Sequence, residues 1–157
     1  MDGPSHSAHL VLLHFGRTRV ALTQRAVRSL EAAADVAFTA TVPGALGTIA
    51  AGGSHWPVYA LDEELAPLRD VPRQRRICAL LATDTGLIGL LCDEAQVLQR
   101  QGLSAYPLPL VMRRAGTPLE GVLQTPDGVA LLSSAPALAA VVGVDAAAAP
   151  PRAMEIA

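Results

Sequence analysis

Three kinds of side chain in this sequence are of types that could carry chemistry: histidines, a serine beside a histidine, and carboxylates. His6, His9 and His14 have a spacing that superficially suits a metal site. From His9 onward, however, the pattern is that of a strand, where positions an odd number apart point to opposite faces, so His9 and His14 diverge. Ser54 and His55 are adjacent, and adjacent side chains on a strand also diverge, which prevents a nucleophile–base pair. We expect no metal site and no hydrolytic pair.

The remaining charged residues do not assemble a catalytic site either. Carboxylates occur at 62–64, 84 and 93–94, where helix starts and strand ends usually place solvated acids. The arginines between 73 and 76 follow a proline and are expected in a solvated loop. All twelve basic residues are arginine, so the chain has no lysine for a phosphate-binding loop, a Schiff base or a general base. We expect no enzyme activity and no cofactor.

Composition restricts the class of partner. The formal net charge is -2 and the arginines are scattered, whereas a nucleic-acid surface normally needs a basic stripe. Hydrophobic residues make up 51% of the chain, yet no window approaches the roughly 18 uninterrupted apolar residues that a membrane span needs. The first residues lack a basic region ahead of an apolar segment, so no secretory signal is expected. We expect a cytoplasmic protein, and the absence of lysine and asparagine suggests a GC-rich bacterial genome.

The two cysteines, Cys78 and Cys92, lie in apolar runs separated by a turn. If that turn closes a hairpin, the two thiols lie on neighbouring strands, where a disulfide or redox pair is one possibility. In a cytoplasmic chain, two small buried hydrophobic residues are the preferred interpretation. Two thiols without a nearby histidine make a poor zinc site.

The elements that position these residues are predicted to be strands. Short apolar runs bounded by turn signals are typical of an all-β barrel or sandwich. The hairpin count would permit two similar β-subdomains. The three predicted hairpins join His9–Phe15 to Thr18–Leu22, Arg76–Ala82 to Leu87–Cys92, and Leu119–Gln124 to Val129–Ser133.

Three segments depart from this pattern. Gln24–Ala34 suits either a helix or a strand, and the sequence does not decide between them. Asp62–Leu68 is predicted to form a helical turn or two, with acids at its positive end. Ser134–Val142 is predicted to be a helix, with Ser134 as the cap, Pro136 in the first turn and Gly143 as the stop.

The segment from Pro43 to Asp62 has the most informative spacing of glycine and proline residues. Gly47 and Gly53 bracket a short apolar run, and glycine at such positions supplies positive φ or close backbone approach. Pro57 then opens the alternating run Val58–Leu61, and proline at a strand start predicts an edge strand.

The order of these pieces resembles the CheW-like domain family, which includes the bacterial chemotaxis coupling protein CheW and the regulatory domain of the kinase CheA. The resemblance covers roughly residues 9–142. The motifs that carry it are LVLLHFGRTRVAL, Val27 and Leu30, Pro43, Gly47, Gly53 with WPVYALD, Ile88–Asp93 followed by Val97, and Gly121–Val142.

The resemblance implies an all-β fold of two small SH3-like five-stranded β-barrels around a shared apolar core, with short helices including one near the C-terminus. We expect residues 1–8 to be a flexible N-terminus, 9–143 the CheW-like domain, and 144–157 a flexible tail rich in alanine and proline. The family implies a non-enzymatic adaptor that couples a chemoreceptor cytoplasmic tip to a CheA-type histidine kinase, in chemotaxis or type IV pilus signalling. Carried over by position, the residues that border the apolar partner groove are Val27, Leu30, Gly53, Trp56, Pro57, Val58 and Tyr59.

Three positions depart from the family pattern. Ser29 stands where a glutamate is common, Gly52 where an arginine is common, and Ala60 where an aspartate is common. The Glu/Arg pair is therefore missing as a pair, which leaves no buried charge alone but alters the polar contact surface. An alternative function is a small-molecule-binding β-domain that kept the fold and lost kinase coupling.

Overall fold

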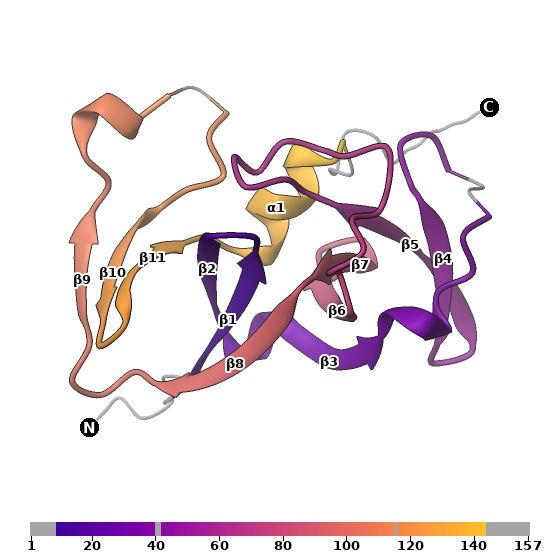
Figure 1. Cartoon of the computed structure of the whole chain (residues 1–157), viewed down its shortest axis with the longest axis horizontal. Coiled ribbons are helices and arrows are strands. Elements are labelled where there is room, and N and C mark those ends of the chain that lie inside the picture. Colours follow the sequence, from indigo (N-terminus) through magenta and orange to yellow (C-terminus); the bar gives the residue numbers. More distant parts are fainter. Residues whose placement is uncertain (1–8, 40–41, 115, 144–157) are drawn as a thin grey trace.

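A computed structural model describes residues 9–39, 42–114 and 116–143. Within these ranges the chain forms two β-sheets with one α-helix between them (Figure 1). We call the sheets barrel A and barrel B because each curls into a half-barrel. The predicted termini, 1–8 and 144–157, lie outside the described residues.

Barrel A has the strand order β8-β1-β2-β11-β10-β9. Its end strands, β8 and β9, are consecutive in the chain, so the sheet must curl to bring its two ends together. The strand bounds are β1 His9–Phe15, β2 Thr18–Thr23, β8 Glu94–Gln99, β9 Ser104–Pro107, β10 Gly121–Thr125 and β11 Gly128–Leu132.

Barrel B has the order β3-β6-β7-β5-β4. Its end strands are likewise consecutive, and an antiparallel bridge between Ala37 and Thr48 carries the chain back onto the outer edge of β4. The strand bounds are β3 Val27–Ala32, β4 Gly47–Ala51, β5 Ser54–Ala60, β6 Ile77–Thr83 and β7 Gly86–Cys92. The predicted two-barrel class is confirmed, with five strands in barrel B and six in barrel A.

The two barrels share one pairing scheme. In each, an antiparallel hairpin (β1–β2 or β6–β7) pairs in parallel with the second strand of another hairpin (β10–β11 or β4–β5). The first strand of the first hairpin then takes an outer partner, β8 in barrel A and β3 in barrel B. The sixth strand of barrel A, β9, occupies the place on β10 that the single Ala37 bridge occupies on β4.

The apolar runs are nearly continuous because the central strands bury both faces. Alternate residues of a strand face opposite sides, so each central strand contributes to two cores. On β1, Val11 and Leu13 enter a shared core between the barrels, while Leu10 and Leu12 enter the outer core of barrel A. The shared core also receives α1 (Ala135–Val141), through Leu138.

Barrel B divides its residues in the same way. On β6, Ala79 and Leu81 enter the shared core, while Cys78 and Leu80 enter the outer core of barrel B. The molecule is thus layered as outer core, sheet, shared core, sheet and outer core.

The three predicted hairpins and the C-terminal helix are confirmed. At the β1–β2 turn Gly16 adopts φ 64, and the turn of β10–β11 ends at Gly128 with φ 128. The Ser134 side chain accepts a hydrogen bond from the amide of Ala137 at 3.2 Å, which caps α1 as expected. Gly143 follows the helix with φ 87.

The structure resolves one open question. Gln24–Ala34 forms two short 3-10 turns, η1 (Gln24–Ala26) and η2 (Ala33–Asp35), on either side of strand β3. Pairing with β6 therefore outweighs the helical preference of its alanines.

Two local predictions were wrong. Asp62–Leu68 is a loop rather than a helix, because the Asp62 side chain accepts the amides of Glu64 and Ala66 and Leu65 adopts φ 63. Strand β5 is internal rather than an edge, because it pairs with both β4 and β7. Pro57 is tolerated there because its missing N–H falls one residue before the β5–β7 ladder begins, at Val58.

Candidate partner-binding surface

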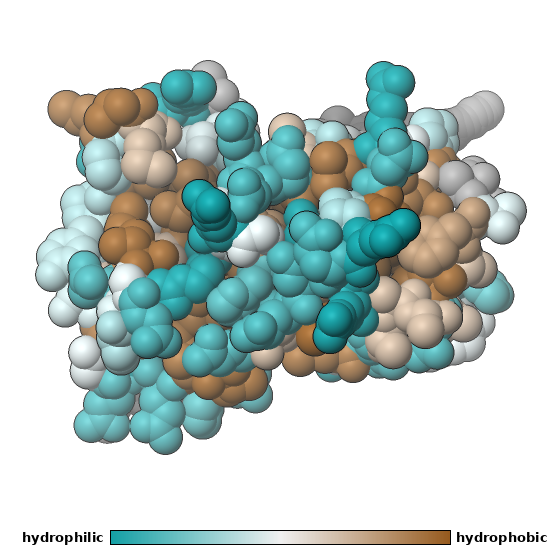
Figure 2. All heavy atoms as spheres, viewed as in Figure 1, coloured by the Kyte–Doolittle hydropathy of each residue, from teal (hydrophilic) through white to brown (hydrophobic). Residues whose placement is uncertain are grey.

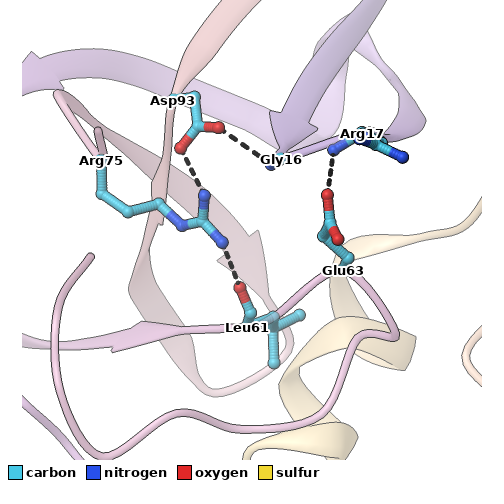
Figure 3. Close-up of polar contacts among 6 residues, drawn as sticks. All are labelled: Gly16, Arg17, Leu61, Glu63, Arg75 and Asp93. Atoms are coloured by element: carbon cyan, nitrogen blue, oxygen red, sulfur yellow. Dashed lines mark hydrogen bonds and ion pairs between the residues drawn. The ribbon is translucent and has the colours of Figure 1, made fainter. Parts of the chain in front are cut away.

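The two barrels meet at a joint of one residue. Strand β7 of barrel B ends at Cys92 and strand β8 of barrel A begins at Glu94, so Asp93 alone connects them. The Asp93 amide donates to the His14 carbonyl at 2.8 Å, and its carboxylate accepts the Gly16 amide at 2.8 Å. The strand crossover is therefore fixed to the β1–β2 hairpin by backbone and side chain, and Figure 3 shows the side-chain contact with Gly16.

Arg75 holds the other side of this joint. Its guanidinium forms an ion pair with Asp93 and donates a second hydrogen bond to the Leu61 carbonyl at 2.8 Å. The group also lies over the Phe15 ring, 5.7 Å from its centroid. The side chain is only 3% exposed, so the prediction of a solvated arginine loop was wrong for Arg75, although Arg73 and Arg76 are exposed.

A second carboxylate holds the same hairpin turn from the loop after β5. The Glu63 carboxylate accepts the Arg17 amide at 2.6 Å (Figure 3). The Glu63 carbonyl accepts the Thr18 hydroxyl at 2.5 Å. Glu63 and Asp93 thus bond two successive amides, Arg17 and Gly16. Glu63 is exposed, as expected for a solvated acid, whereas Asp93 is half-buried, and both bind backbone amides at the joint.

An open hollow of about 460 Å³ lies beside the joint. Its lining residues are Gly16, Asp62, Glu63, Glu64, Leu68, Pro72, Gln74 and Arg75. The groups best placed for chemistry already have partners, since Asp62 caps its own loop and Glu63 caps the hairpin. Throughout the described residues, no three His, Cys, Asp or Glu side chains gather as metal ligands.

Both thiols are free and buried, in line with the preferred interpretation. Cys78 faces the outer core of barrel B and Cys92 faces the shared core. Burial raises the pKa of each thiol to about 12, with smaller contributions from Glu31 at Cys78 and from Cys78 and Asp93 at Cys92. Thiolate chemistry at neutral pH is therefore suppressed at both sites.

Two predicted partner-binding residues, Val27 and Leu30, lie on β3 at the margin of the shared core. They stand opposite Leu81 and Ala79 of β6, whose side chains enter that core. Val27 packs against it, whereas Leu30 is 43% exposed.

Sequence reasoning gave no role to one residue on the facing barrel. Val97 of β8 is 53% exposed and stands opposite Val11, which belongs to the shared core. Val97 therefore lies on the face of barrel A that turns toward barrel B. The pairing register with β1 places Val97 on this face. In the sequence, position 97 was marked only as a hydrophobic residue of the family motif.

Three further predicted residues lie at the β4–β5 hairpin. Gly52 and Gly53 form its turn with φ values of 62 and 81, which match the type I′ geometry that glycines favour. Trp56 is half-buried: its indole donates to the Ala51 carbonyl at 2.9 Å and its ring lies against Gly86. Pro57 is half-buried beside it, opposite Thr48.

The last two predicted residues are buried. Val58 is fully inside the outer core of barrel B, and Tyr59 is 2% exposed in the shared core. Burial raises the Tyr59 pKa. The seven residues are therefore not brought into one exposed patch. Val27 and Leu30 form one group, Gly53 with Trp56 and Pro57 a second, and Val58 with Tyr59 lie beneath the surface.

Comparison with known proteins identifies the fold. The sequence matches no protein-family model and no curated protein. Among solved structures it is similar to the crystal structure of the scaffolding protein TtCheW from Thermoanaerobacter tengcongensis, with a TM-score of 0.65 and 19% sequence identity. The match covers 82% of this chain and 89% of that chain. The fold is therefore CheW-like, as the motif order predicted.

In the described ranges, none of the helices combines the length and the hydropathy needed to cross a bilayer.

Proposed function

We propose that the chain is a non-enzymatic, cytoplasmic adaptor of the CheW type. In this role it couples a chemoreceptor cytoplasmic tip to a CheA-type histidine kinase, in chemotaxis or type IV pilus signalling. The observation that carries the proposal is the architecture: two barrels with one pairing scheme around a shared core, in a fold similar to that of the scaffolding protein TtCheW. The proposed folded unit spans residues 9–143.

The receptor tip is proposed to bind along the margin of the shared core. Leu30 from barrel B and Val97 from barrel A are both exposed there, on faces that continue into buried apolar residues. An amphipathic receptor helix that covers this margin would bury both side chains and extend the core outward. Val27 would support Leu30 from below.

The kinase regulatory domain is proposed to contact the surface of barrel B around the β4–β5 hairpin. Gly53, Trp56 and Pro57 are the accessible predicted residues, and Val58 and Tyr59 hold the strand from inside. The type I′ turn leaves Gly52 without a neighbour within 4 Å, so the arginine that is common in the family would project into open space here. Kinase contact is therefore proposed to depend on shape and apolar area rather than on a Glu/Arg pair.

The joint supplies what an adaptor needs between its two contacts. Asp93 is the only residue between β7 and β8; Arg75 pairs with Asp93, and Glu63 accepts an amide of the facing hairpin. The barrels therefore hold a fixed relative orientation, so that a receptor at the margin and a kinase on barrel B keep a defined geometry.

The test is a pull-down with the full chain immobilised, using a purified CheA-type regulatory domain and a receptor cytoplasmic-tip fragment. We expect both to be retained, and Leu30→Asp to lower receptor retention about tenfold, because it places a charge in an apolar contact. Val129→Asp is the matched control, since Val129 is 51% exposed at the distant end of barrel A. Failure to retain either protein would contradict the proposal.

The open hollow supports a second candidate, a small-molecule-binding domain that lost kinase coupling. The hollow measures about 460 Å³ and combines carboxylates with Leu68 and Pro72. A ligand there would raise the melting temperature in a metabolite screen, and Glu64→Gln would abolish that rise. An unchanged melting temperature across the screen, together with retained kinase domain, would decide for the adaptor.

A further inference from the structure

The connection from β9 to β10 carries the most exposed large apolar side chains of the described residues. Leu110 and Val111 of η3 (Leu110–Met112) are 78% and 80% exposed. This connection projects from the upper left of the molecule in Figure 1, and hydrophobic residues mark the same corner in Figure 2. We call residues 108–114 and 116–119 the projecting loop. Exposed side chains of this kind, gathered on one protrusion, are typical of interaction sites.

The projecting loop is ordered by its own hydrogen bonds. Within η3 the amides of Met112 and Arg113 donate to the carbonyls of Pro109 and Leu110 at 2.9 and 3.0 Å. The Arg113 Nε donates to the Leu108 carbonyl at 2.6 Å, and the Leu108 side chain is buried. A loop that is already ordered pays little conformational entropy when it binds a partner.

The returning half of the loop is tied to barrel A. The Ser133 hydroxyl donates to the Pro118 carbonyl at 2.7 Å, and Leu119 packs against the shared core. The Leu119 amide also donates to the Thr117 hydroxyl at 3.3 Å. Both ends of the loop are therefore anchored while its tip stays exposed.

A pocket of about 260 Å³ lies within the loop. It is lined by Val111, Met112, Arg114, Thr117 and Leu119. The aliphatic walls suit an apolar side chain, and the exposed guanidinium of Arg114 at the rim suits a carboxylate beside it. A concave site of this kind fits a single protruding side chain. It therefore favours a protein partner over a lipid surface, which presents no such side chain.

The projecting loop itself carries charge of one sign, and the acidic Glu120 follows directly after it. Residues 95–119 contain Arg100, Arg113 and Arg114 and no aspartate or glutamate, so they carry +3 while the rest of the chain carries -5, giving the total of -2. The partner that complements this surface is acidic as well as apolar.

We propose that the projecting loop is a docking site for an acidic, apolar peptide segment of a protein partner. An apolar side chain of the segment enters the pocket between Val111 and Leu119, and a neighbouring carboxylate pairs with Arg114. The site lies on barrel A, apart from Leu30 and the β4–β5 hairpin of barrel B, and it adds a contact beyond the proposed receptor and kinase contacts.

The test begins with selection of a random peptide library, displayed on phage, against the immobilised full chain. We expect enrichment of peptides that place Asp or Glu beside Leu, Ile or Phe. The strongest peptide, labelled with fluorescein, is then titrated by fluorescence anisotropy. Its affinity should fall at least about tenfold with Arg114→Glu and with Val111→Asp, and it should weaken as salt is raised.

Two matched variants keep the test specific. Arg69→Glu changes an exposed arginine on barrel B, and Val129→Asp changes an exposed valine at the opposite end of barrel A. Both should bind the peptide with unchanged affinity. Because Val111 and Arg114 are exposed, all four variants should keep the wild-type circular dichroism spectrum.

Three outcomes would overturn the proposal. The first is enrichment of peptides without acidic residues. The second is an affinity that Arg114→Glu and Val111→Asp leave unchanged. The third is sedimentation of the chain with phosphatidylserine vesicles that both variants abolish while no peptide binds, because that result assigns the loop to a membrane surface.

Discussion

Barrels A and B follow one pairing scheme but differ in how well each fills its outer core. Among the residues that the structure describes, the outer core of barrel B contains seven buried residues, with seven partly buried hydrophobic residues around them, including Trp56 and Leu68. The outer core of barrel A, over the same ranges, contains five buried residues and three partly buried ones. Since the shared core covers one face of both sheets, the difference lies entirely on the outer faces.

The exposed apolar side chains are distributed in the opposite sense. The structure describes eight exposed large hydrophobic residues, and five of them belong to barrel A and its projecting loop: Val97, Tyr106, Leu110, Val111 and Val129. The other three, Leu30, Phe38 and Val42, belong to barrel B and its connections. The same strand topology therefore buries more apolar side chains in the outer core of barrel B and exposes more of them on the surface of barrel A.

The largest expected effect tests whether the joint makes the barrels unfold together. Asp93→Asn removes the charge that pairs with Arg75, whose side chain is 3% exposed. A buried arginine without its partner charge should lower the free energy of unfolding by about 3–5 kcal/mol. Urea unfolding should be followed by fluorescence of Trp56, which reports barrel B, and by circular dichroism, which reports both barrels.

The two probes should give coincident transitions in both proteins. Asp127→Asn, in the exposed β10–β11 turn, is the control and should change stability by less than about 0.5 kcal/mol. Separate Trp56 and circular dichroism transitions in the unaltered chain would show that the barrels are independent, which contradicts a single folded unit.

The next effect compares the two outer cores directly. Leu80 of barrel B and Leu12 of barrel A are both fully buried and both belong to central strands. Leu80→Ala should cost about 3–5 kcal/mol and Leu12→Ala about 2–3 kcal/mol, because a sparser core collapses more readily around a cavity. Urea titration measures both, and equal or reversed costs would remove the proposed difference in packing.

Alkaline pH should weaken barrel B and the shared core. Burial raises the pKa of Cys78 and Cys92 to about 12, above the ordinary value of 9.0. The neutral thiol of each cysteine contributes fully to stability below pH 9. This contribution is lost as the pH rises toward 12, because the thiols ionise in the unfolded chain but stay neutral in the folded one. Each cysteine should add about 1.4 kcal/mol of lost stability per pH unit in this window.

The slope of stability against pH is the measurement, taken from urea midpoints between pH 9 and pH 10. Cys78→Ala should reduce the slope by about half. The outer core of barrel A contains no cysteine, so Leu12→Ala should lower stability at every pH and leave the slope unchanged. A slope that Cys78→Ala does not alter would assign the alkaline effect to another group.

The smallest effect is expected at the projecting loop. Val111→Asp should change the free energy of unfolding by less than about 0.5 kcal/mol, because the side chain is 80% exposed. Thermal unfolding measures it. A loss above about 1 kcal/mol would show that barrel A uses its exposed residues for its own stability rather than for contact.

Elements with local signals were the ones that the sequence predicted. The hairpins around Gly16 and Gly128 and the helix capped by Ser134 depend on residues within a few positions of each other. Strands β8 and β9 have no comparable signal, because Val97 and Tyr106 are exposed and the apolar alternation is short. Their pairing comes from distant strands, β1 and β10.

The residues of the candidate site also differ in whether a local sequence signal could predict them. Leu30 was predicted from motif order, but its position at the shared-core margin follows only from its register with Ala79. Arg75 could not be separated in sequence from the exposed Arg73 and Arg76, since its burial depends on Asp93, Leu61 and Phe15 together. Such a contact is set by tertiary structure, and no short window of sequence contains it.

The order of the strands along the chain has a consequence for how the molecule is made. Barrel B is a continuous stretch, β3 to β7, inserted between the two parts of barrel A, β1–β2 and β8–β11. On the ribosome, all of barrel B emerges before β8 and β11 are available to cover the β1–β2 hairpin. Because that hairpin is apolar on both faces, we expect the nascent barrel B to shelter one face through the shared core while the other waits for the last strands. The interior of barrel A is thus the final part of the protein to leave water.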